Sequence, residues 1–366
     1  MNQIRSVAII GLGVIGGSMA VTWKRTRPDL NITGIDDRVT LDAALGAGAI
    51  DRAALTIQEG VESSDLVVIA TPLSAIPDAL RSVGKYARED AVVTDTASVK
   101  NAISDLAADY IPPSMKFVGG HPMTGSEKSG FSAADDFLFE NSVYVLCPEP
   151  DSIEQTKEGS ALVDCIRSLG ARILVMDPVE HDRAAAAISH VPQLLSVALV
   201  NSAELPTDDK ARLLAAGGFR DMTRIASSSF DMWRGIIAAN HGQVLDKLGA
   251  ITARIQQMRN RIIEEDYDDL ARLFAEAEAS RAMISTDTKG FLAPLADLLV
   301  RVHDRPGELK TITALLSDAD INIKDLELLK LREGTGGTFR ISFASDKEAA
   351  SAARLLQEQG YQTRKP

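Results

Sequence analysis

The sequence predicts three domains in series: an α/β domain with a parallel sheet, an all-α domain and a small α+β domain. Over about the first 180 residues, short apolar runs alternate with helical stretches, as in a parallel sheet covered by helices. From Val179 to Ile284 strand signals almost disappear, and Ala, Leu, Arg and Glu dominate. The last 70 or so residues alternate helix and strand again. A chain of 366 residues is also too long for one hydrophobic core.

The composition excludes several classes of protein. No apolar run approaches the roughly 18 residues that span a bilayer, and the N-terminus has no signal-peptide layout, so we expect a cytoplasmic protein without membrane contact. The two cysteines, Cys147 and Cys165, form no CxxC pair, and no His/Cys/Asp cluster has metal-ligand spacing, so neither disulfides nor a metal site are expected. The net charge of −12 argues against a nucleic-acid partner.

The first domain, which we place at residues 1–178, contains short, mostly β-branched runs, as strands buried on both faces require. Its predicted strands are Val7–Ile10, Ile32–Ile35, Leu66–Ala70, Ala91–Thr94, Phe117–Val118, Val143–Leu146 and Ile173–Met176.

A glycine-rich turn directly follows the first predicted strand and precedes a helix. This context makes it the dinucleotide fingerprint of a Rossmann-type domain. Gly11 would permit the tight turn, Gly13 the close approach of a pyrophosphate, and Gly16 the packing of helix on strand. The free N–H groups of the helix N-terminus would receive the phosphates. The predicted cofactor-binding residues of the turn are Gly11, Leu12, Gly13, Val14, Ile15 and Gly16.

An acidic residue, Asp36, ends the second strand 20 residues beyond Gly16. It would accept hydrogen bonds from the ribose hydroxyls and repel a 2′-phosphate, so we predict NAD rather than NADP as the cofactor. Because Asp37 and Arg38 follow, some use of NADP stays open. Thr71-Pro72 follows a strand at the same sheet edge and is either a cofactor contact or a plain strand exit.

A histidine, His121, lies just past a predicted strand in a glycine-rich loop, on the edge that carries the glycine turn. An ordinary imidazole titrates near pH 6.5 and can be neutral at working pH, so His121 is a candidate base, although a loop histidine taken alone is more often a surface residue. Ser98 either hydrogen-bonds His121 or caps the helix expected from Val99, and both roles are compatible.

Several motifs together resemble those of the prephenate and arogenate dehydrogenases over roughly residues 5–285. Thr124 and Ser126 are modest departures, and the family often has a second histidine where Gln193 stands. The resembling segments are Gly11–Ser18, Asp95–Lys100, Gly119–Gly130, Ile188–Gln193 and Gly217–Ala226, with Trp233 shortly after.

The resemblance implies an NAD-dependent oxidative decarboxylation of prephenate to 4-hydroxyphenylpyruvate in tyrosine biosynthesis. Hydride leaves C4 of a cyclohexadienol while the ring carboxylate departs as carbon dioxide, and the ring becomes aromatic. His121 is then the catalytic base, with Ser98 touching the same substrate hydroxyl. Two alternatives stay open: an arogenate dehydrogenase that makes tyrosine directly, and a non-enzymatic amino-acid or nucleotide sensor on the same scaffold.

The resemblance also suggests substrate-binding residues. Arg224 would hold a substrate carboxylate through two parallel hydrogen bonds. Arg220, four residues earlier and hence on the same helical face, is either a second grip or a solvated charge. His190 lies in an apolar helix two residues before Pro192, which should kink it, and is either a substrate contact or a core residue. Ser126 would donate to the substrate tail.

The all-α domain, which we place at residues 179–290, carries a narrow apolar seam with steps of three and four residues. Such a seam predicts a homodimer, or else packing within the domain. His181, His241 and His303 have no setting like that of His121, and we interpret them as structural. The seam residues are Val244, Leu248, Ile251, Ile255, Met258 and Ile262.

The last domain, residues 295–366, follows a linker at Gly290–Pro294 and has the order β-α-β-β-α-β, the ferredoxin-like arrangement. Leu298–Leu309 and Asp320–Ile323 resemble an ACT domain. This implies an amino-acid effector, with tyrosine as our hypothesis, or a dimerisation module without ligand. The predicted elements are Leu298–Val302, Glu308–Leu316, Ile321–Leu331, Gly334–Gly337 as hairpin tip, Thr338–Ala344 and Lys347–Gln359, and the predicted effector residues are Asp304, Pro306, Gly307, Asn322 and Ile323.

Overall fold

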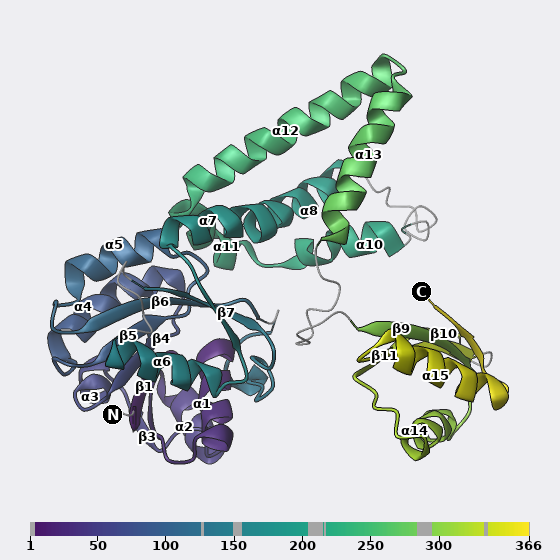
Figure 1. The fold of residues 1–366 in the computed structure, drawn as a ribbon. Coiled ribbons are helices and arrows are strands. Elements are labelled where there is room, and N and C mark those ends of the chain that lie inside the picture. Colours follow the sequence, from purple (N-terminus) through teal and green to yellow (C-terminus); the bar gives the residue numbers. More distant parts are fainter. Residues whose placement is uncertain are drawn as a thin grey trace. The chain divides into compact units, whose positions relative to one another are not determined.

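The computed structural model describes residues 4–125, 128–148, 156–203, 215, 217–283, 295–332 and 336–365 (Figure 1). It forms two compact units, an N-terminal unit (Met1–Arg272) and a C-terminal unit (Leu273–Pro366). Each unit has its own hydrophobic core. The predicted fold class, a Rossmann-type α/β domain followed by an all-α domain and a ferredoxin-like α+β domain, is confirmed.

The N-terminal unit is built on one eight-stranded sheet with the order β3-β2-β1-β4-β5-β6-β7-β8. The order reverses between β1 and β4, and ligands of such sheets bind at the carboxyl ends of the strands beside this point. The strands are β1 (Ser6–Ile10), β2 (Asn31–Ile35), β3 (Arg52–Ala54), β4 (Leu66–Ile69), β5 (Val92–Asp95), β6 (Lys116–Pro122), β7 (Val143–Cys147) and β8 (Arg172–Val175).

Two features of this sheet differ from the prediction. β3 was not expected, because Arg52–Ala54 is too short and polar to give a strand signal. The sheet is also not purely parallel, since β6 and β7 pair antiparallel. A parallel pair needs a long crossover, usually a helix, whereas the described residues between β6 and β7 contain only the 3₁₀ turn Phe131–Ala133.

Helices cover both faces of the sheet. One core joins Met19 and Trp23 to Leu162 and Cys165, whereas the other gathers side chains such as Leu80 and Ile103. The helices of this region are α1 (Val14–Thr26), α2 (Arg38–Gly46), α3 (Ile57–Val61), α4 (Ile76–Tyr86), α5 (Asn101–Tyr110) and α6 (Lys157–Arg167).

The remainder of the N-terminal unit is helical. The helix disruption expected at Pro192 takes the form of a π-helical turn, Ala186–His190, between two α-helices. Further along the chain, a 3₁₀ turn, Arg224–Ser227, separates two more helices. The α-helices are α7 (Pro178–Ala185), α8 (Val191–Ser202), α10 (Gly217–Thr223), α11 (Phe230–Ala239), α12 (His241–Ile263) and α13 (Tyr267–Ala282), the last of which crosses the boundary between the units.

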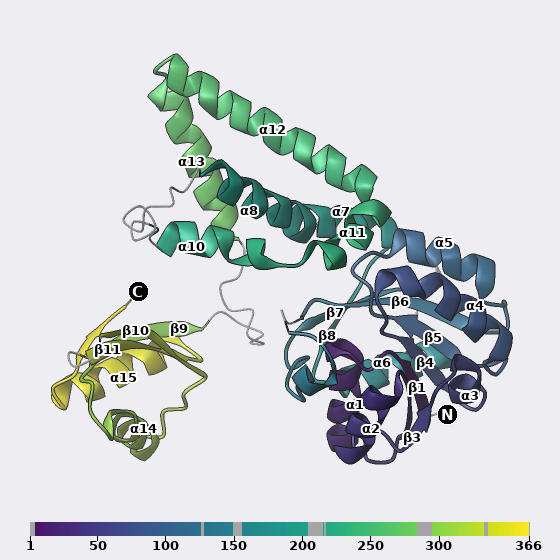
Figure 2. The ribbon, with the colours of Figure 1, turned by 180° about the vertical axis from the view of Figure 1, so that it is seen from behind.

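The apolar seam of α12 serves two surroundings. Its first half packs within the domain: Val244 is buried against Ala186 and Val191, with Leu248 and Ile251 alongside. Towards its C-terminal end α12 diverges from α8 (Figures 1 and 2), and Ile255 and Ile262 are each 56% exposed. Packing within the domain therefore explains only half of the seam.

One structural feature was not expected from the sequence. The continuous helix Pro178–Ser202 is long and apolar enough to cross a membrane, judged by length and composition alone. Core helices of globular proteins pass the same test. About 33% of its most apolar window is buried, and the buried side chains of the helix include the polar His190, Gln193 and Ser196.

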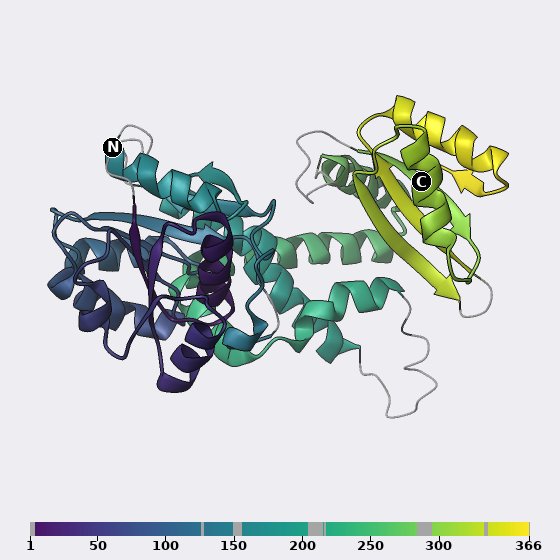
Figure 3. The ribbon, with the colours of Figure 1, turned by 90° about the horizontal axis from the view of Figure 1, so that it is seen from below.

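The C-terminal unit confirms the predicted element order. Its four strands form an antiparallel sheet, β10-β11-β9-β12, and both helices join the strands in one core (Figure 3). The second strand begins at Asp325 instead of Ile321, so Asn322 and Ile323 lie in the connection before it. The linker Gly290–Pro294 and Gly334 of the hairpin tip lie outside the described residues. The elements are β9 (Ala296–Val302), α14 (Glu308–Asp318), β10 (Asp325–Arg332), β11 (Gly336–Phe343), α15 (Asp346–Glu358) and β12 (Gln362–Arg364).

Candidate active site

The glycine turn has the geometry of a phosphate cradle. Gly11 has a φ of +92°, and a Cβ at this residue would lie 2.7 Å from the Ala70 carbonyl oxygen. A Cβ on Gly16 would lie only 2.0 Å from the Gly11 carbonyl oxygen, so helix α1 can approach the turn only with glycine there. Gly13 is different. A Cβ at this residue would meet no heavy atom within 4 Å apart from those of its chain neighbours and of its own helix backbone. The first and third glycines are needed for packing, and the second leaves open space.

Asp36 closes this turn from the end of β2. Its Oδ2 accepts a hydrogen bond from the Leu12 amide at 2.7 Å, and its Oδ1 accepts one from the Asp37 amide at 2.7 Å. No side chain caps the N-terminus of α1, and its first turn contains no acidic residue. The amides of Val14 and Ile15, as residues of that first turn, have no intrahelical acceptor. An anion is the natural partner for such a helix end.

The segment after β4 connects this turn with the helical domain. The Thr71 methyl group lies 3.2 Å from the position of a Cβ on Gly11, so Thr71 borders the turn. Its hydroxyl is buried without a hydrogen-bond partner among the described residues. Pro72 is exposed, and the next residue, Leu73, packs against Gly235 of α11 at 3.2 Å from a Cβ there. Thr71-Pro72 thus lies between the glycine turn and the helices.

His121 lies within β6 and not in a loop after it, which corrects the prediction. The strand continues through His121 because it pairs with Val145 of β7. The preceding residue, Gly120, donates its amide to Asp95 Oδ1 at 3.0 Å and accepts from Lys100 Nζ at 2.6 Å. Lys100 and Asp95 are fully buried and form an ion pair. These contacts fix the backbone directly before His121.

The His121 ring faces a second histidine that the sequence analysis interpreted as structural. His121 Nδ1 lies 2.8 Å from His181 Nε2, and His181 Nδ1 lies 2.8 Å from Asp182 Oδ1. The Asp182 carboxylate also accepts hydrogen bonds from the amides of Lys100 at 2.7 Å and Asn101 at 3.0 Å. A histidine–aspartate pair at a helix start after a strand was the only sequence signal for this contact.

Ser98 neither caps α5 nor hydrogen-bonds His121, so these two predictions are wrong, whereas its contact with the substrate hydroxyl stays a prediction. Helix α5 begins at Asn101 instead of Val99, and the Asp182 carboxylate accepts from its first amides, so Ser98 is not the cap. Nδ1 of His121 contacts His181, and no hydrogen bond joins the His121 ring to Ser98. The Ser98 backbone instead hydrogen-bonds His190.

Burial decides the charge of His121. It holds the pKa of His121 well below the ordinary 6.5, and the positive charge of Lys100 and the neighbouring His181 and His190 act in the same direction. Burial alone would raise the pKa of Asp182, but hydrogen bonds from His181 and from the amides of Lys100 and Asn101 outweigh it and lower the pKa. His121 is therefore neutral and Asp182 is ionised at neutral pH.

His190 is buried among Asn240, Ser98 and Trp233. Asn240 Nδ2 donates to the Asp182 carbonyl oxygen at 2.8 Å, which sets the amide orientation, and lies 3.3 Å from His190 Nδ1. Burial lowers the pKa of His190, against the opposing charge of Asp182. A hydrogen bond with the Ser98 backbone also raises the pKa of His190, so one ring N–H donates to the Ser98 carbonyl oxygen. Nε2 of His190 is buried, and the hydrogen bonds among the described residues give it no partner; the same is true of Nε1 of Trp233, whose ring packs edge-on against His190 at 6.1 Å.

The two arginines predicted to bind substrate are exposed. Helix α10 ends at Thr223, and Arg224 begins a 3₁₀ turn, so Arg220 and Arg224 do not share the face of one α-helix as predicted. The turn is tied to α8 because Gln193 Nε2 donates to the Ile225 carbonyl oxygen at 2.9 Å. Gln193 lies three residues after His190, so the turn of Arg224 is anchored close to that histidine. Ser126 lies outside the described residues.

The ACT-like turn lies in the C-terminal unit. Asp304, Pro306 and Gly307 connect β9 to α14, where Gly307 has a φ of +94° and no heavy atom counted around its Cβ position within 4 Å. Of the two later effector candidates, Asn322 is exposed, whereas Ile323 packs against the core.

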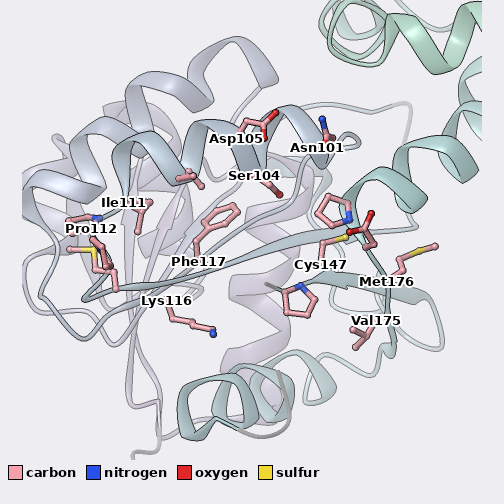
Figure 4. A pocket seen from close by; sticks show the side chains of 17 residues that line it. Asn101, Ser104, Asp105, Ile111, Pro112, Lys116, Phe117, Cys147, Val175 and Met176 are labelled. Carbon is pink, nitrogen blue, oxygen red and sulfur yellow. The ribbon is translucent and has the colours of Figure 1, made fainter. Parts of the chain in front are cut away.

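A separate cavity of about 830 Å³ lies along α5 and the strands β6 to β8 (Figure 4). Phe117, Cys147 and Met176 are among its lining residues, but His121, Arg224 and the glycine turn are not. This cavity is therefore not part of the candidate active site.

Three family models match successive parts of the chain. A model described as "Prephenate dehydrogenase, nucleotide-binding domain" matches residues 19–175, beginning just after the glycine turn. A model described as "Prephenate dehydrogenase, dimerization domain" matches residues 177–276, and an ACT domain model matches residues 296–360.

Whole-chain relatives give the same result. The chain is 37% identical to prephenate dehydrogenase of Bacillus subtilis over 98% of this chain and 97% of the relative. It is 32% identical to prephenate dehydrogenase of Lactococcus lactis, over 97% of this chain and 98% of the relative.

Solved structures of similar fold include prephenate dehydrogenase from Aquifex aeolicus in complex with hydroxyphenyl propionate and NAD+. It has a TM-score of 0.69 and 28% identity, over 77% of this chain and 99% of that one. Arogenate dehydrogenase of Synechocystis has a TM-score of 0.67 and 27% identity, over 76% of this chain and 99% of that one. Because these relatives are enzymes, the alternative of a non-enzymatic sensor is disfavoured. The chain belongs to the prephenate dehydrogenase family and is a dehydrogenase with a C-terminal ACT domain.

Proposed function

We propose that the protein catalyses the NAD-dependent oxidative decarboxylation of prephenate to 4-hydroxyphenylpyruvate. The observation that carries this proposal is the state of His121. It is buried and neutral on the strand β6, its Nδ1 is engaged by His181, and the described residues give its Nε2 no partner. A neutral imidazole with one free nitrogen is suited to accept a proton.

NAD fits the residues of the glycine turn. The open space at Gly13, the uncapped N-terminus of α1 and the unpartnered hydroxyl of Thr71 would receive its pyrophosphate, and Asp36 its adenosine ribose. Both Asp36 oxygens already accept one backbone amide each, which orients the carboxylate and leaves further lone pairs. Its charge disfavours a 2′-phosphate, which supports NAD over NADP. The relative from Aquifex aeolicus has NAD+ bound.

The chain's residues would act on the substrate as follows. NAD, when bound, supplies the acceptor for the electron pair that leaves C4 with its hydrogen. His121 takes the C4 hydroxyl proton at Nε2. Departure of the ring carboxylate as carbon dioxide leaves an aromatic phenolate, to which His121 can return that proton, so no net proton is released. Arg224 would hold a carboxylate, and the buried Nε2 of His190 would contact the side-chain end of the substrate.

The direct test mixes the purified protein with NAD and prephenate and follows the NADH absorbance. We expect turnover in the unsubstituted protein and a loss of about 10²–10⁴-fold in kcat for His121→Asn, the range that a general base contributes. The variant should bind NAD as tightly as the unsubstituted protein, because His121 does not belong to the glycine turn. Undiminished turnover by His121→Asn would contradict the assigned base.

Arogenate is the alternative substrate, supported by the similarity to the Synechocystis arogenate dehydrogenase. The two substrates differ in having a ketone or an amino group on the side chain. The relatives at 37% and 32% identity over nearly the whole chain are prephenate dehydrogenases, whereas the arogenate dehydrogenase is 27% identical over 76% of it. We therefore expect a higher kcat/KM for prephenate than for arogenate, and the reverse order would assign the chain to the alternative.

We further propose a homodimer formed through the helical domain, whose boundary we keep at residues 179–290. The exposed side of α12 with Ile255 and Ile262 supports it, as does the match to a dimerization-domain model. Light scattering should give twice the chain mass of 39.2 kDa. Replacing both isoleucines by Asp should give monomers, with Val39→Asp, at another exposed apolar residue, as the control.

The ACT domain supports an amino-acid effector, for which we propose tyrosine as the end product of the pathway. The left-handed turn at Gly307 and the exposed Asn322 would bind its α-groups. Calorimetry with tyrosine should show binding that Asn322→Ala weakens. An absence of heat with all amino acids would leave the domain as a dimerisation module.

A further inference from the structure

We propose that His181 and Asp182 are positioning residues that fix the tautomer of the catalytic base, so that Nε2 of His121 carries the lone pair that faces the substrate. The proposal rests on the proposed role of His121 and concerns groups that do not themselves touch the reacting atoms. It follows from the hydrogen-bond geometry in three steps.

The first step concerns Asp182, which is an obligatory acceptor. Its Oδ1 receives the Lys100 amide at 2.7 Å, and its Oδ2 receives the Asn101 amide at 3.0 Å. An amide N–H can only donate, so both oxygens must be acceptors and the carboxylate has no reason to hold a proton. The third contact of this group, to His181 Nδ1 at 2.8 Å, is then one in which the histidine donates.

The second step concerns the direction of the hydrogen bond between His181 and His121. A neutral imidazole with its proton on Nδ1 has an accepting Nε2. With His181 in this neutral form, its Nε2, which lies 2.8 Å from His121 Nδ1, accepts a hydrogen that His121 supplies from Nδ1. The other nitrogen of His121, Nε2, is left with a lone pair. The Asp182 carboxylate thus determines, through His181, which ring nitrogen of His121 carries the proton.

The third step explains why the spacing is held. The backbone amide of Lys100 holds Asp182, whereas its side chain donates to the Gly120 carbonyl oxygen at 2.6 Å. The same residue therefore anchors both the carboxylate that orients His181 and the strand residue next to His121. The charged or titratable groups that influence this site are Lys100, Asp95, His190 and the two members of the pair themselves.

Two variants at the same position separate polarity from bulk. His181→Leu removes both nitrogens, whereas Gln in His181→Gln keeps one acceptor and one donor. We expect kcat with prephenate to fall about 10²-fold in His181→Leu, a large part of a general base's contribution, and to stay within about tenfold in His181→Gln. KM for prephenate and the Kd for NAD should change less than about twofold in both, because the proposal places His181 behind His121 and out of contact with either ligand.

The tautomer is measured directly by nitrogen NMR on the full chain labelled at its five histidines, without substrate. We expect the His121 signals, assigned with His121→Asn, to show a protonated Nδ1 and an unprotonated Nε2, and this pattern to be lost in His181→Leu. A protonated Nε2 in the unsubstituted protein would overturn the proposal, even if the variants fail to fold. So would an unchanged kcat in a folded His181→Leu. If the unsubstituted protein does not oxidise prephenate, the proposed function fails, while the spectrum still decides the tautomer.

Discussion

Two glycines of the same turn should respond oppositely to the same substitution. In Gly16→Ser, the new Cβ would lie 2.0 Å from the Gly11 carbonyl oxygen and 3.0 Å from Ile9 Cγ2. Contacts under 3.0 Å do not persist, so helix α1 or the turn must move by about an ångström. Overpacking of this kind costs about 1–3 kcal/mol of unfolding free energy. At 2–4 °C per kcal/mol for a domain of this size, the Tm of the N-terminal unit should fall by roughly 2–12 °C.

Gly13→Ser is the matched variant, because the space around its Cβ is open and serine is at least as good an N-cap as glycine. The Tm without ligand should therefore change little, while a side chain in the path of the pyrophosphate should raise the Kd for NAD at least about tenfold, or 1.4 kcal/mol. Differential scanning fluorimetry with and without NAD measures both quantities. Unaltered NAD affinity in Gly13→Ser would refute the placement of the cofactor, and an unaltered Tm in Gly16→Ser would refute the packing argument.

Three further predictions concern the chemical end of the site. Arg224→Lys should raise KM for prephenate about tenfold, since a single ammonium replaces a two-pronged guanidinium, and a steady-state assay showing an unaltered KM would remove Arg224 from the site. Asn240→Leu should cost about 1–3 kcal/mol of unfolding free energy, measured by urea unfolding, because the buried Asp182 carbonyl oxygen loses its donor. The lowered pKa of His121 means that the unfolded chain binds a proton below pH 6.5 that the folded chain does not, so stability is retained above pH 6.5 and falls below it, by up to about 1.4 kcal/mol per pH unit. Urea titrations at several pH values between 5 and 8 give the unfolding free energy at each pH. This free energy should depend less steeply on pH in His121→Asn than in the unsubstituted protein, and an equal dependence would contradict the lowered pKa.

Local patterns were sufficient for most of the architecture. Alternating apolar runs and a glycine turn between strand and helix predicted the Rossmann-type domain, because the period of burial and the conformational freedom of glycine are properties of neighbouring residues. The element order of the C-terminal domain was predicted for the same reason. The antiparallel pairing of β6 with β7 was not, since which strands pair is decided by contacts between distant segments.

The amino-acid sequence alone determined the fold classes and predicted the place of the cofactor turn, and its resemblance to a known family predicted the candidate base, His121. Only the tertiary structure decided how that base is held, because His181 and Asp182 lie some 60 residues away along the chain and reach it across the edge of the sheet. It also replaced Ser98 by a carboxylate as the partner of the first amides of α5. The physical reason is that hydrogen-bond polarity and desolvation depend on which groups are brought together, and no periodicity along the chain records that.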